Sequence, residues 1–316
     1  MDDLDDDLAV LAERCADADP GIRRVAMMAL AESIEPEAEA LLVAGLADAD
    51  SAVREAAARG LDEHDGEAAS LALVGALDDA AAPVRLAAAE VLFDRKDTRI
   101  GAALLQRVGH ADAFVRTAAL RALRELVLPE AREPCLAALA DPAPEVRREA
   151  VGVLGYLRDA ATVPALVKLA TDADAEVRRA VAAALVISGP DSAGGPALLA
   201  CLADADWQVR EQAAASIGKA RLAMAAEPLM VALADPAWQV RVKAAGALGK
   251  LKARSAVAAL GGALTDPVSN LRKEAAAALG DIGDAAGLTW LEAAANDPDP
   301  DVRKIVRWAV TCCRAA

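Results

Sequence analysis

The side chains that could support metal or nucleophilic chemistry are few and scattered. The two histidines, His64 and His110, lie far apart in the sequence, without the clustered histidines of common zinc sites. The chain has no glycine-rich phosphate loop, no Gly-x-Ser-x-Gly nucleophile elbow and no Cys-x-x-Cys pair. We therefore expect no catalytic residue, no metal ligand and no cofactor.

The cysteines offer one unusual feature, the vicinal thiols Cys312 and Cys313 near the end of the sequence. Such a pair could hold a soft metal ion or react with an electrophilic cofactor, but we favour two small apolar side chains on a terminal helix. Cys15, Cys135 and Cys201 occupy different phases of their predicted helices, so we expect them in the core. Five cysteines in 316 residues do not make a disulfide framework.

The most regular feature is an aspartate followed six positions later by an arginine. Successive arginines are 31 residues apart, except for one step of 32 residues. The arginines are Arg23, Arg54, Arg85, Arg116, Arg147, Arg178, Arg210, Arg241, Arg272 and Arg303. The aspartates are Asp17, Asp48, Asp79, Asp141, Asp172, Asp204, Asp235, Asp266 and Asp297, and His110 stands in the remaining place. A fixed period of this length indicates a solenoid.

Each arginine lies near the start of a predicted helix. In the sixth copy Val177, Val181, Ala184 and Leu185 form one apolar stripe at helical spacing. Glycines eight residues after the arginine predict left-handed helix ends, at Gly155, Gly218, Gly249 and Gly280. A second helix fills the rest of each period, as in residues 161–170 and 256–264. Each repeat therefore contains two helices.

The outline Asp-x-Asp/Pro-x-x-Val-Arg-x-x-Ala-x-x-Ala-Leu-Gly resembles the short HEAT repeat, in particular the HEAT-like repeat of phycobilisome lyases. The resemblance covers essentially the whole chain and implies an all-α, right-handed α-superhelical solenoid of ten two-helix repeats. It also implies that the aspartates and arginines link neighbouring repeats, because charge-assisted hydrogen bonds can fix the stacking register. Since His110 replaces an aspartate, we expect Arg116 to lack its usual partner.

We expect one solenoid spanning residues 1–316. Residues 189–196 carry the additional residue and several glycines, so they predict a hinge between repeats 1–6 (about 1–188) and repeats 7–10 (about 197–316). The first 16 residues predict a capping helix with acidic residues at its start. Repeat 10 has no following repeat to cover it, so Trp308 and Ile305 are either exposed or buried against another molecule, including a second copy.

Charge is unevenly distributed along the chain. Residues 1–160 contain 32 acidic and 17 basic side chains, whereas residues 161–316 contain 17 of each. This acidity disfavours nucleic acid and anionic membranes, and attracts a basic protein segment. The sequence lacks a membrane-spanning apolar run and begins with acids rather than a secretory signal, so we expect a soluble, cytoplasmic protein.

The helix stripe also predicts which residues face the concave groove. Positions 3 and 2 before each arginine, and 1, 5 and 9 after it, point away from the core. Aromatic, amide and basic side chains at these positions are candidates for partner binding. They are Phe114, Tyr156, Trp207, Gln208, Lys219, Trp238, Gln239, Lys250 and Trp308. The alternative is that the tryptophans pack on the next repeat and stiffen the stack, which we favour for Trp290.

These observations favour a non-catalytic protein-binding scaffold or adaptor that holds a partner segment in its groove. By family analogy it would serve the assembly or maturation of a cofactor-bearing protein. The alternative from the enzyme class is a phycobilin lyase or isomerase subunit, in which Cys312, Trp207 or Trp238 would contact a tetrapyrrole. A nucleic-acid reader is a third possibility, against which the acidic charge argues.

Overall fold

The computed structural model describes residues 2–33, 35–187 and 192–315, with side chains from residue 8 onward. All regular secondary structure in these ranges is helical. The chain divides into two compact units, Met1–Leu157 (unit 1) and Arg158–Ala316 (unit 2). The structure is therefore an α-solenoid, and each unit is considered separately below.

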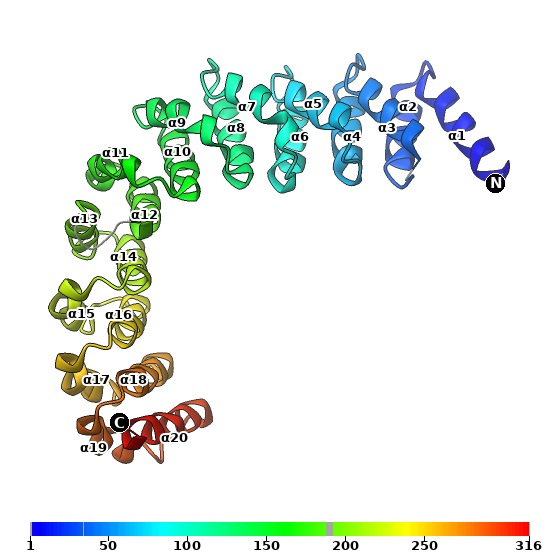
Figure 1. Cartoon of the computed structure of the whole chain (residues 1–316). Coiled ribbons are helices and arrows are strands. Elements are labelled where there is room, and N and C mark those ends of the chain that lie inside the picture. Colours follow the sequence, from blue (N-terminus) through cyan, green and yellow to red (C-terminus); the bar gives the residue numbers. More distant parts are fainter. Residues whose placement is uncertain (1, 34, 188–191, 316) are drawn as a thin grey trace. The chain divides into compact units, whose positions relative to one another are not determined.

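Unit 1 contains five helix pairs joined by short turns (Figure 1). Its α-helices are α1 (Asp2–Cys15), α2 (Pro20–Leu30), α3 (Pro36–Gly45), α4 (Ser51–Gly60), α5 (Glu67–Ala76), α6 (Ala82–Asp94), α7 (Gly101–Arg107), α8 (Ala113–Leu126), α9 (Arg132–Ala138) and α10 (Pro144–Leu157). Three short 3-10 helices are η1 (Leu61–Glu63), η2 (Thr98–Ile100) and η3 (Pro129–Ala131).

Unit 2 repeats the same arrangement. Its α-helices are α11 (Val163–Lys168), α12 (Ala175–Ala184), α13 (Gly194–Cys201), α14 (Trp207–Ala220), α15 (Ala226–Ala232), α16 (Trp238–Lys250), α17 (Val257–Ala263), α18 (Ser269–Ile282), α19 (Leu288–Ala293) and α20 (Pro300–Ala315). Its 3-10 helices are η4 (Ala160–Thr162), η5 (Leu169–Thr171), η6 (Leu185–Ile187), η7 (Ala223–Ala225), η8 (Arg254–Ala256) and η9 (Ala285–Gly287).

The helices of each unit form two layers. The even-numbered helices, which carry the repeating arginines, pack side by side, and each odd-numbered helix packs against the even-numbered helix that follows it (Figure 1). The core between the layers consists mainly of alanine, leucine and valine, and includes the predicted stripe of Val177, Val181, Ala184 and Leu185. We call the outer surface of the even-numbered helices the even-helix face.

The glycines eight residues after the arginine do not end the helices as the sequence suggested. Gly155, Gly218, Gly249 and Gly280 all lie inside even-numbered helices. A Cβ atom on Gly249 would lie 2.8 Å from the Cα of Ala278, and one on Gly218 would lie 2.9 Å from the Cα of Ala247. These glycines therefore allow neighbouring even-numbered helices to approach closely.

The left-handed backbone lies three residues later, eleven residues after the arginine. Positive φ angles occur at Val127, Arg158, Arg221, Lys252 and Gly283. Only the last of these is a glycine, so the sequence did not mark the position. A β-branched residue such as Val127 is strained in this conformation.

The structure describes the predicted N-terminal helix but only part of the predicted hinge. The N-terminal residues form α1, which packs on α2 and α3. The predicted hinge at 189–196 lies partly outside the described residues, which omit 188–191, and residues 194–196 belong to the start of α13. The division into units instead follows Leu157, and the hinge stays a prediction.

Candidate functional site

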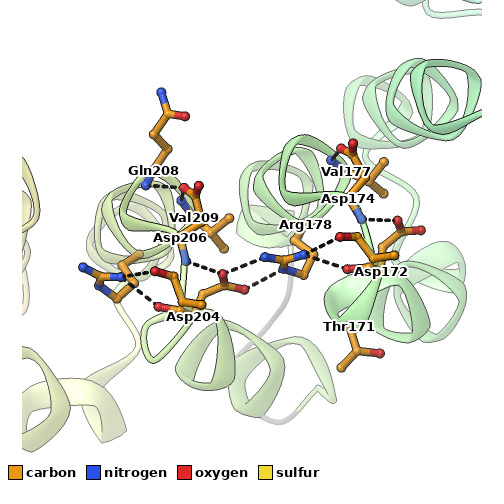
Figure 2. A network of polar contacts seen from close by, with 12 residues as sticks. Thr171, Asp172, Asp174, Val177, Arg178, Asp204, Asp206, Gln208 and Val209 are labelled. Atoms are coloured by element: carbon orange, nitrogen blue, oxygen red, sulfur yellow. Dashed lines mark hydrogen bonds and ion pairs between the residues drawn. The ribbon is translucent and has the colours of Figure 1, made fainter.

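The aspartates and arginines form a ladder that joins one repeat to the next. Arg178 illustrates the geometry: its Nε and Nη2 donate to both carboxylate oxygens of Asp204, at 2.7 and 2.9 Å (Figure 2). Its Nη1 donates to the backbone carbonyl of Asp172, six residues earlier in the same repeat. Arg178 thus binds the aspartate of its own repeat through the backbone carbonyl and the aspartate of the following repeat through the carboxylate.

The same ion pair recurs within both units. In unit 1 it joins Arg23 to Asp48, Arg54 to Asp79 and Arg116 to Asp141. In unit 2 it also joins Arg210 to Asp235 and Arg272 to Asp297 at 2.7 Å, whereas Arg241 and Asp266 make a longer contact of 3.4 Å. At the ends of the units Arg147 and Arg303 bind the carbonyls of Asp141 and Asp297, and Asp17 accepts from the amide of Asp19.

Hydrogen bonding stabilises the charged form of the ladder carboxylates. The bond from Arg178 lowers the pKa of Asp204, and the bond from Arg23 lowers the pKa of Asp48. Each aspartate also accepts from the backbone amide two residues later, as Asp204 does from Asp206. These carboxylates hold the turns and the repeats together, and we assign them this structural role.

The substitution at His110 affects a different arginine from the one we expected. Arg116 is paired with Asp141 at 2.7 Å, because the ladder runs from each arginine to the following repeat. The arginine that faces position 110 is Arg85, whose buried Nε has no hydrogen-bond partner. Its guanidinium lies over the ring of Phe114, 5.7 Å from the centroid. His110 keeps the local contacts of the aspartate, since its Nδ1 accepts from the amide of Asp112 and its carbonyl accepts from Arg116, but it provides no carboxylate for the preceding repeat.

A second link between repeats was not visible in the sequence pattern. Arg95 is buried, and its guanidinium donates to the backbone carbonyls of Leu61 and His64 and to the hydroxyl of Ser70. Burial lowers the pKa of Arg95. This arginine therefore closes the end of the preceding even-numbered helix. It falls outside the ladder spacing, so periodicity could not identify it.

The predicted partner-binding residues of unit 2 do not form a single patch. Trp207 and Trp238 begin α14 and α16, whereas Lys219 and Lys250 lie in the last turns of the same helices. Twelve residues of helix separate each pair by about 18 Å. The tryptophans are 36% and 41% exposed, and Gln208 and Gln239 beside them are half-buried. Gln208 extends away from the ladder (Figure 2).

The lysine end of these helices lines a polar hollow of about 380 Å³. Its charged lining consists of Glu211 and Lys219 from α14, Lys243 and Lys250 from α16, and Glu274 from α18. Ala215 and Gly246 form part of its wall. Burial raises the pKa of Glu274, and the neighbouring lysines oppose this rise.

The remaining two tryptophans rest on glycines of the preceding repeat. A Cβ atom on Gly261 would lie 2.3 Å from the ring of Trp290, and one on Gly280 would lie 2.4 Å from the ring of Trp308. Trp308 is still 44% exposed. Ile305 is half-buried. One side of each of these two tryptophan rings therefore packs against the preceding repeat.

The even-helix face of unit 1 carries two hollows. One lies between α2 and α4, has a volume of about 400 Å³ and is lined by Met28, Ala31, Ala52, Ala56 and the rim residues Arg24, Glu55 and Arg59. The other lies between α6 and α8, has a volume of about 330 Å³ and is lined by Leu86, Phe93, Phe114 and Ala118, with Glu90, Asp94 and Arg121 at its rim. We call them the first and second apolar hollows.

Arginines and aromatic rings continue this face from α8 to α10. Arg124 lies 5.7 Å from the ring centroids of both Phe93 and Tyr156. Its guanidinium also reaches Glu149, which is 4% exposed and is bonded by Arg148 at 2.9 Å. Tyr156 is 48% exposed, as expected for a residue on this face. Sequence reasoning missed Phe93 and Arg124, because they lie eight residues after their arginines and outside the positions we considered.

The described residues contain no cluster of histidine, cysteine, aspartate and glutamate that could hold a metal ion. Burial raises the pKa of Cys135 to about 12 and that of Cys201 to about 11, which makes both thiols poor nucleophiles. Cys313 is buried and its Sγ donates to the carbonyl of Leu279, whereas Cys312 and Cys15 are half-buried. Cys313 is therefore a core residue.

Comparisons with known proteins agree with this architecture. The family model described as HEAT repeats matches residues 8–93, 132–218 and 226–311. No curated protein matches the chain. Within the part that the structure describes, no helix is both long and apolar enough to cross a bilayer.

Several solved structures share the fold at low identity. An engineered protein is 22% identical with a TM-score of 0.56, and the alignment covers 96% of this chain and 98% of that one. YibA of E. coli is 20% identical with a TM-score of 0.52, covering 92% and 96%. Importin β is 15% identical with a TM-score of 0.63, and the alignment covers 96% of this chain and 50% of that one. This chain therefore spans about half the length of importin β. Because the family model matches most of the sequence, the chain belongs to the HEAT-repeat family.

Proposed function

We propose that the protein is a non-catalytic scaffold that binds a segment of a partner protein on its even-helix face. The observation that carries this proposal is the exposure of large apolar side chains on this face, including Met28 (56%), Leu86 (47%), Tyr156 (48%) and Trp238 (41%). Aromatic and apolar side chains in hollows flanked by charged residues are typical of protein interfaces. The described residues offer no matching set of catalytic groups.

The fold supports the same assignment. A solenoid presents equivalent positions of successive repeats on one surface, so a partner segment can contact several repeats at once. Kap95p, a structural neighbour of 15% identity and TM-score 0.63 over 95% of this chain and 51% of that one, binds RanGDP. We propose binding of a protein partner for this chain by analogy, with charge favouring a basic segment. A role in the maturation of a cofactor-bearing protein stays a prediction by family analogy.

The tryptophans of unit 2 provide a direct test. The double variant Trp207→Ala/Trp238→Ala removes two exposed rings, and the matched variant Met224→Ala/Val231→Ala removes two exposed apolar side chains (55% and 77% exposed) from η7 and α15, outside the even-helix face. Each protein is immobilised, exposed to the lysate of its source cells, and the retained proteins are quantified by mass spectrometry.

We expect a specific partner to be lost from the tryptophan variant and retained by the matched variant, with similar melting temperatures. Unchanged retention with a lower melting temperature would show that Trp207 and Trp238 stabilise the stack and do not bind. An absorbance spectrum of the purified protein addresses the phycobilin alternative, because a copurified tetrapyrrole would favour a lyase or isomerase.

A further inference from the structure

The two apolar hollows of unit 1 belong to the same surface and are separated by a polar bridge. Both lie in valleys between even-numbered helices of one compact unit. The valley between them, from α4 to α6, is spanned by Arg59, which binds Glu90 at 2.8 Å and Glu55 at 3.3 Å. A ligand that crosses this surface therefore meets an apolar site, a charged site and a second apolar site in turn.

The bridge carries a net negative charge. One guanidinium faces two carboxylates in the Glu55–Arg59–Glu90 group, and both Arg59 and Glu90 have 52% of their side chains exposed. Unit 1 as a whole has 31 acidic and 16 basic side chains. A basic side chain is therefore the complementary group at the bridge, and the charge of the unit attracts it from a distance.

The spacing of the hollows selects the conformation of the ligand. Neighbouring packed helices are about 8–10 Å apart, so the two valleys are separated by roughly 16–20 Å. An extended chain advances about 3.3 Å per residue and covers this distance in about six residues. Its side chains alternate between two faces, so residues six apart point into the same surface. A helix would place a continuous stripe of apolar side chains over the bridge.

Resting on the proposed function, we infer that unit 1 binds an extended segment carrying two large apolar side chains six residues apart. A lysine or arginine two or four residues after the first apolar side chain faces the Glu55–Arg59–Glu90 bridge. Met28 and its alanine neighbours receive one apolar side chain, and Leu86, Phe93 and Phe114 receive the other. Two anchors on one chain bind more tightly than either alone, because the second binds at high effective concentration.

Synthetic peptides test the inference without knowledge of the natural partner. The probes are fluorescein-labelled peptides with two leucines at separations from three to fourteen residues in a Ser/Gln background, with one lysine two residues after the first leucine. Affinity for the full chain is measured by fluorescence anisotropy. We expect the tightest binding at a separation of six residues, at least tenfold tighter than at five or seven and than a single-leucine peptide.

Variants assign the binding to the two hollows. Met28→Glu and Phe93→Glu should each reduce the affinity of the six-residue peptide to that of the single-leucine peptide. Leu86→Glu serves as a second variant of the same hollow, since Phe93 also contacts Arg121 and Arg124. Val231→Ala in α15 of unit 2, which lies outside the even-helix face, should leave binding unchanged. Replacing the peptide's lysine with glutamate should weaken binding at least fivefold.

Three outcomes would overturn the inference: no dependence on separation, a maximum near eleven residues, which indicates a helical ligand because eleven residues of helix advance about 16.5 Å and return to the same face, or equal binding by the Met28→Glu variant. None of them would remove the proposed scaffold function, because the lysate experiment with the tryptophan variants examines binding by unit 2 to the natural partner. If neither the peptide experiment nor the lysate experiment gives its expected result, both proposals are wrong.

Discussion

Restoring the missing carboxylate of the ladder should stabilise unit 1. In His110→Asp, the new carboxylate lies opposite Arg85, as Asp79 lies opposite Arg54 and Asp141 lies opposite Arg116. Those pairs have side chains only 11–16% exposed, so the new hydrogen bonds are largely shielded from water. The buried Nε of Arg85 gains an acceptor, and an aspartate can still accept from the amide of Asp112.

The expected gain is about 1 kcal/mol in the free energy of unfolding. Charge-assisted hydrogen bonds contribute about 1.5–3 kcal/mol, whereas the loss of the Arg85–Phe114 contact costs about 0.5–1 kcal/mol. The 3.4 Å contact between His110 and Asp78 is exposed and contributes little. The new carboxylate also approaches Asp78, and Arg107, which binds Asp78 at 2.9 Å, reduces that repulsion.

Urea unfolding and amide hydrogen exchange measure the effect, and exchange localises it to α6, α7 and α8. His110→Asn is the matched control, since it keeps a turn acceptor without the charge and should leave stability nearly unchanged. The reciprocal change Asp141→His should destabilise by at least about 1 kcal/mol, because it leaves Arg116 without its carboxylate. The proposed role of the ladder would be refuted if His110→Asp and His110→Asn were equally stable. It would also be refuted if amide hydrogen exchange in α6, α7 and α8 were no slower in His110→Asp than in the original protein.

Three further changes test other parts of the structure. Val127→Gly should stabilise the protein by about 0.5–1 kcal/mol in urea unfolding, because glycine relieves the strain at φ 50°. Gly283→Ala should destabilise it for the same reason. Effects of the opposite sign would be inconsistent with left-handed backbone at the ends of these helices. Gly249→Ala should destabilise the protein by about 1–2 kcal/mol, because the new methyl group would contact Ala278. Gly262 faces open space in α17, so Gly262→Ala should be neutral or stabilising by up to about 1 kcal/mol. Similar values for both variants would contradict the close packing of α16 and α18. The pKa values of Asp48, Asp79 and Asp204 are lowered in the folded state, as is that of Asp297, so the native chain binds fewer protons on acidification than the unfolded chain does. Stability should therefore be constant above about pH 5 and fall as the pH drops below 3.8, the ordinary pKa of an aspartate. A urea midpoint that rises on acidification would contradict the ladder.

The sequence predicted the helices and the repeat because both arise from local, periodic constraints. The period of Arg23 to Arg303 marks every even-numbered helix, and the apolar stripe identifies the buried side. The direction of the ladder was not predictable from spacing alone. Asp141 lies six residues before Arg147 and 25 after Arg116, and only the fold shows that its carboxylate pairs with Arg116.

The candidate site was predicted less completely, because it depends on the valleys between helices. The rule that positions 1, 5 and 9 after the arginine face outward agrees with Leu86, Arg121 and Lys250, which line hollows. It omitted Phe93, eight residues after Arg85, because a large side chain can reach the neighbouring valley. It also grouped Trp238 with Lys250, although they occupy opposite ends of α16. Side-chain length and helix length, which the period does not encode, decide these cases.

Site-specific photo-crosslinking tests the central claim most directly. A photoreactive side chain replaces Leu86 or Trp238 on the even-helix face, or Leu71 or Val231 on α5 and α15 of the odd-numbered layer, all of which are exposed. The cross-linked proteins are identified after irradiation in the source cells. The account predicts that a partner protein is captured from position 86 or from position 238, each on the even-helix face of its own unit, and not from 71 or 231. Capture of that partner from the odd-numbered helices alone would contradict it.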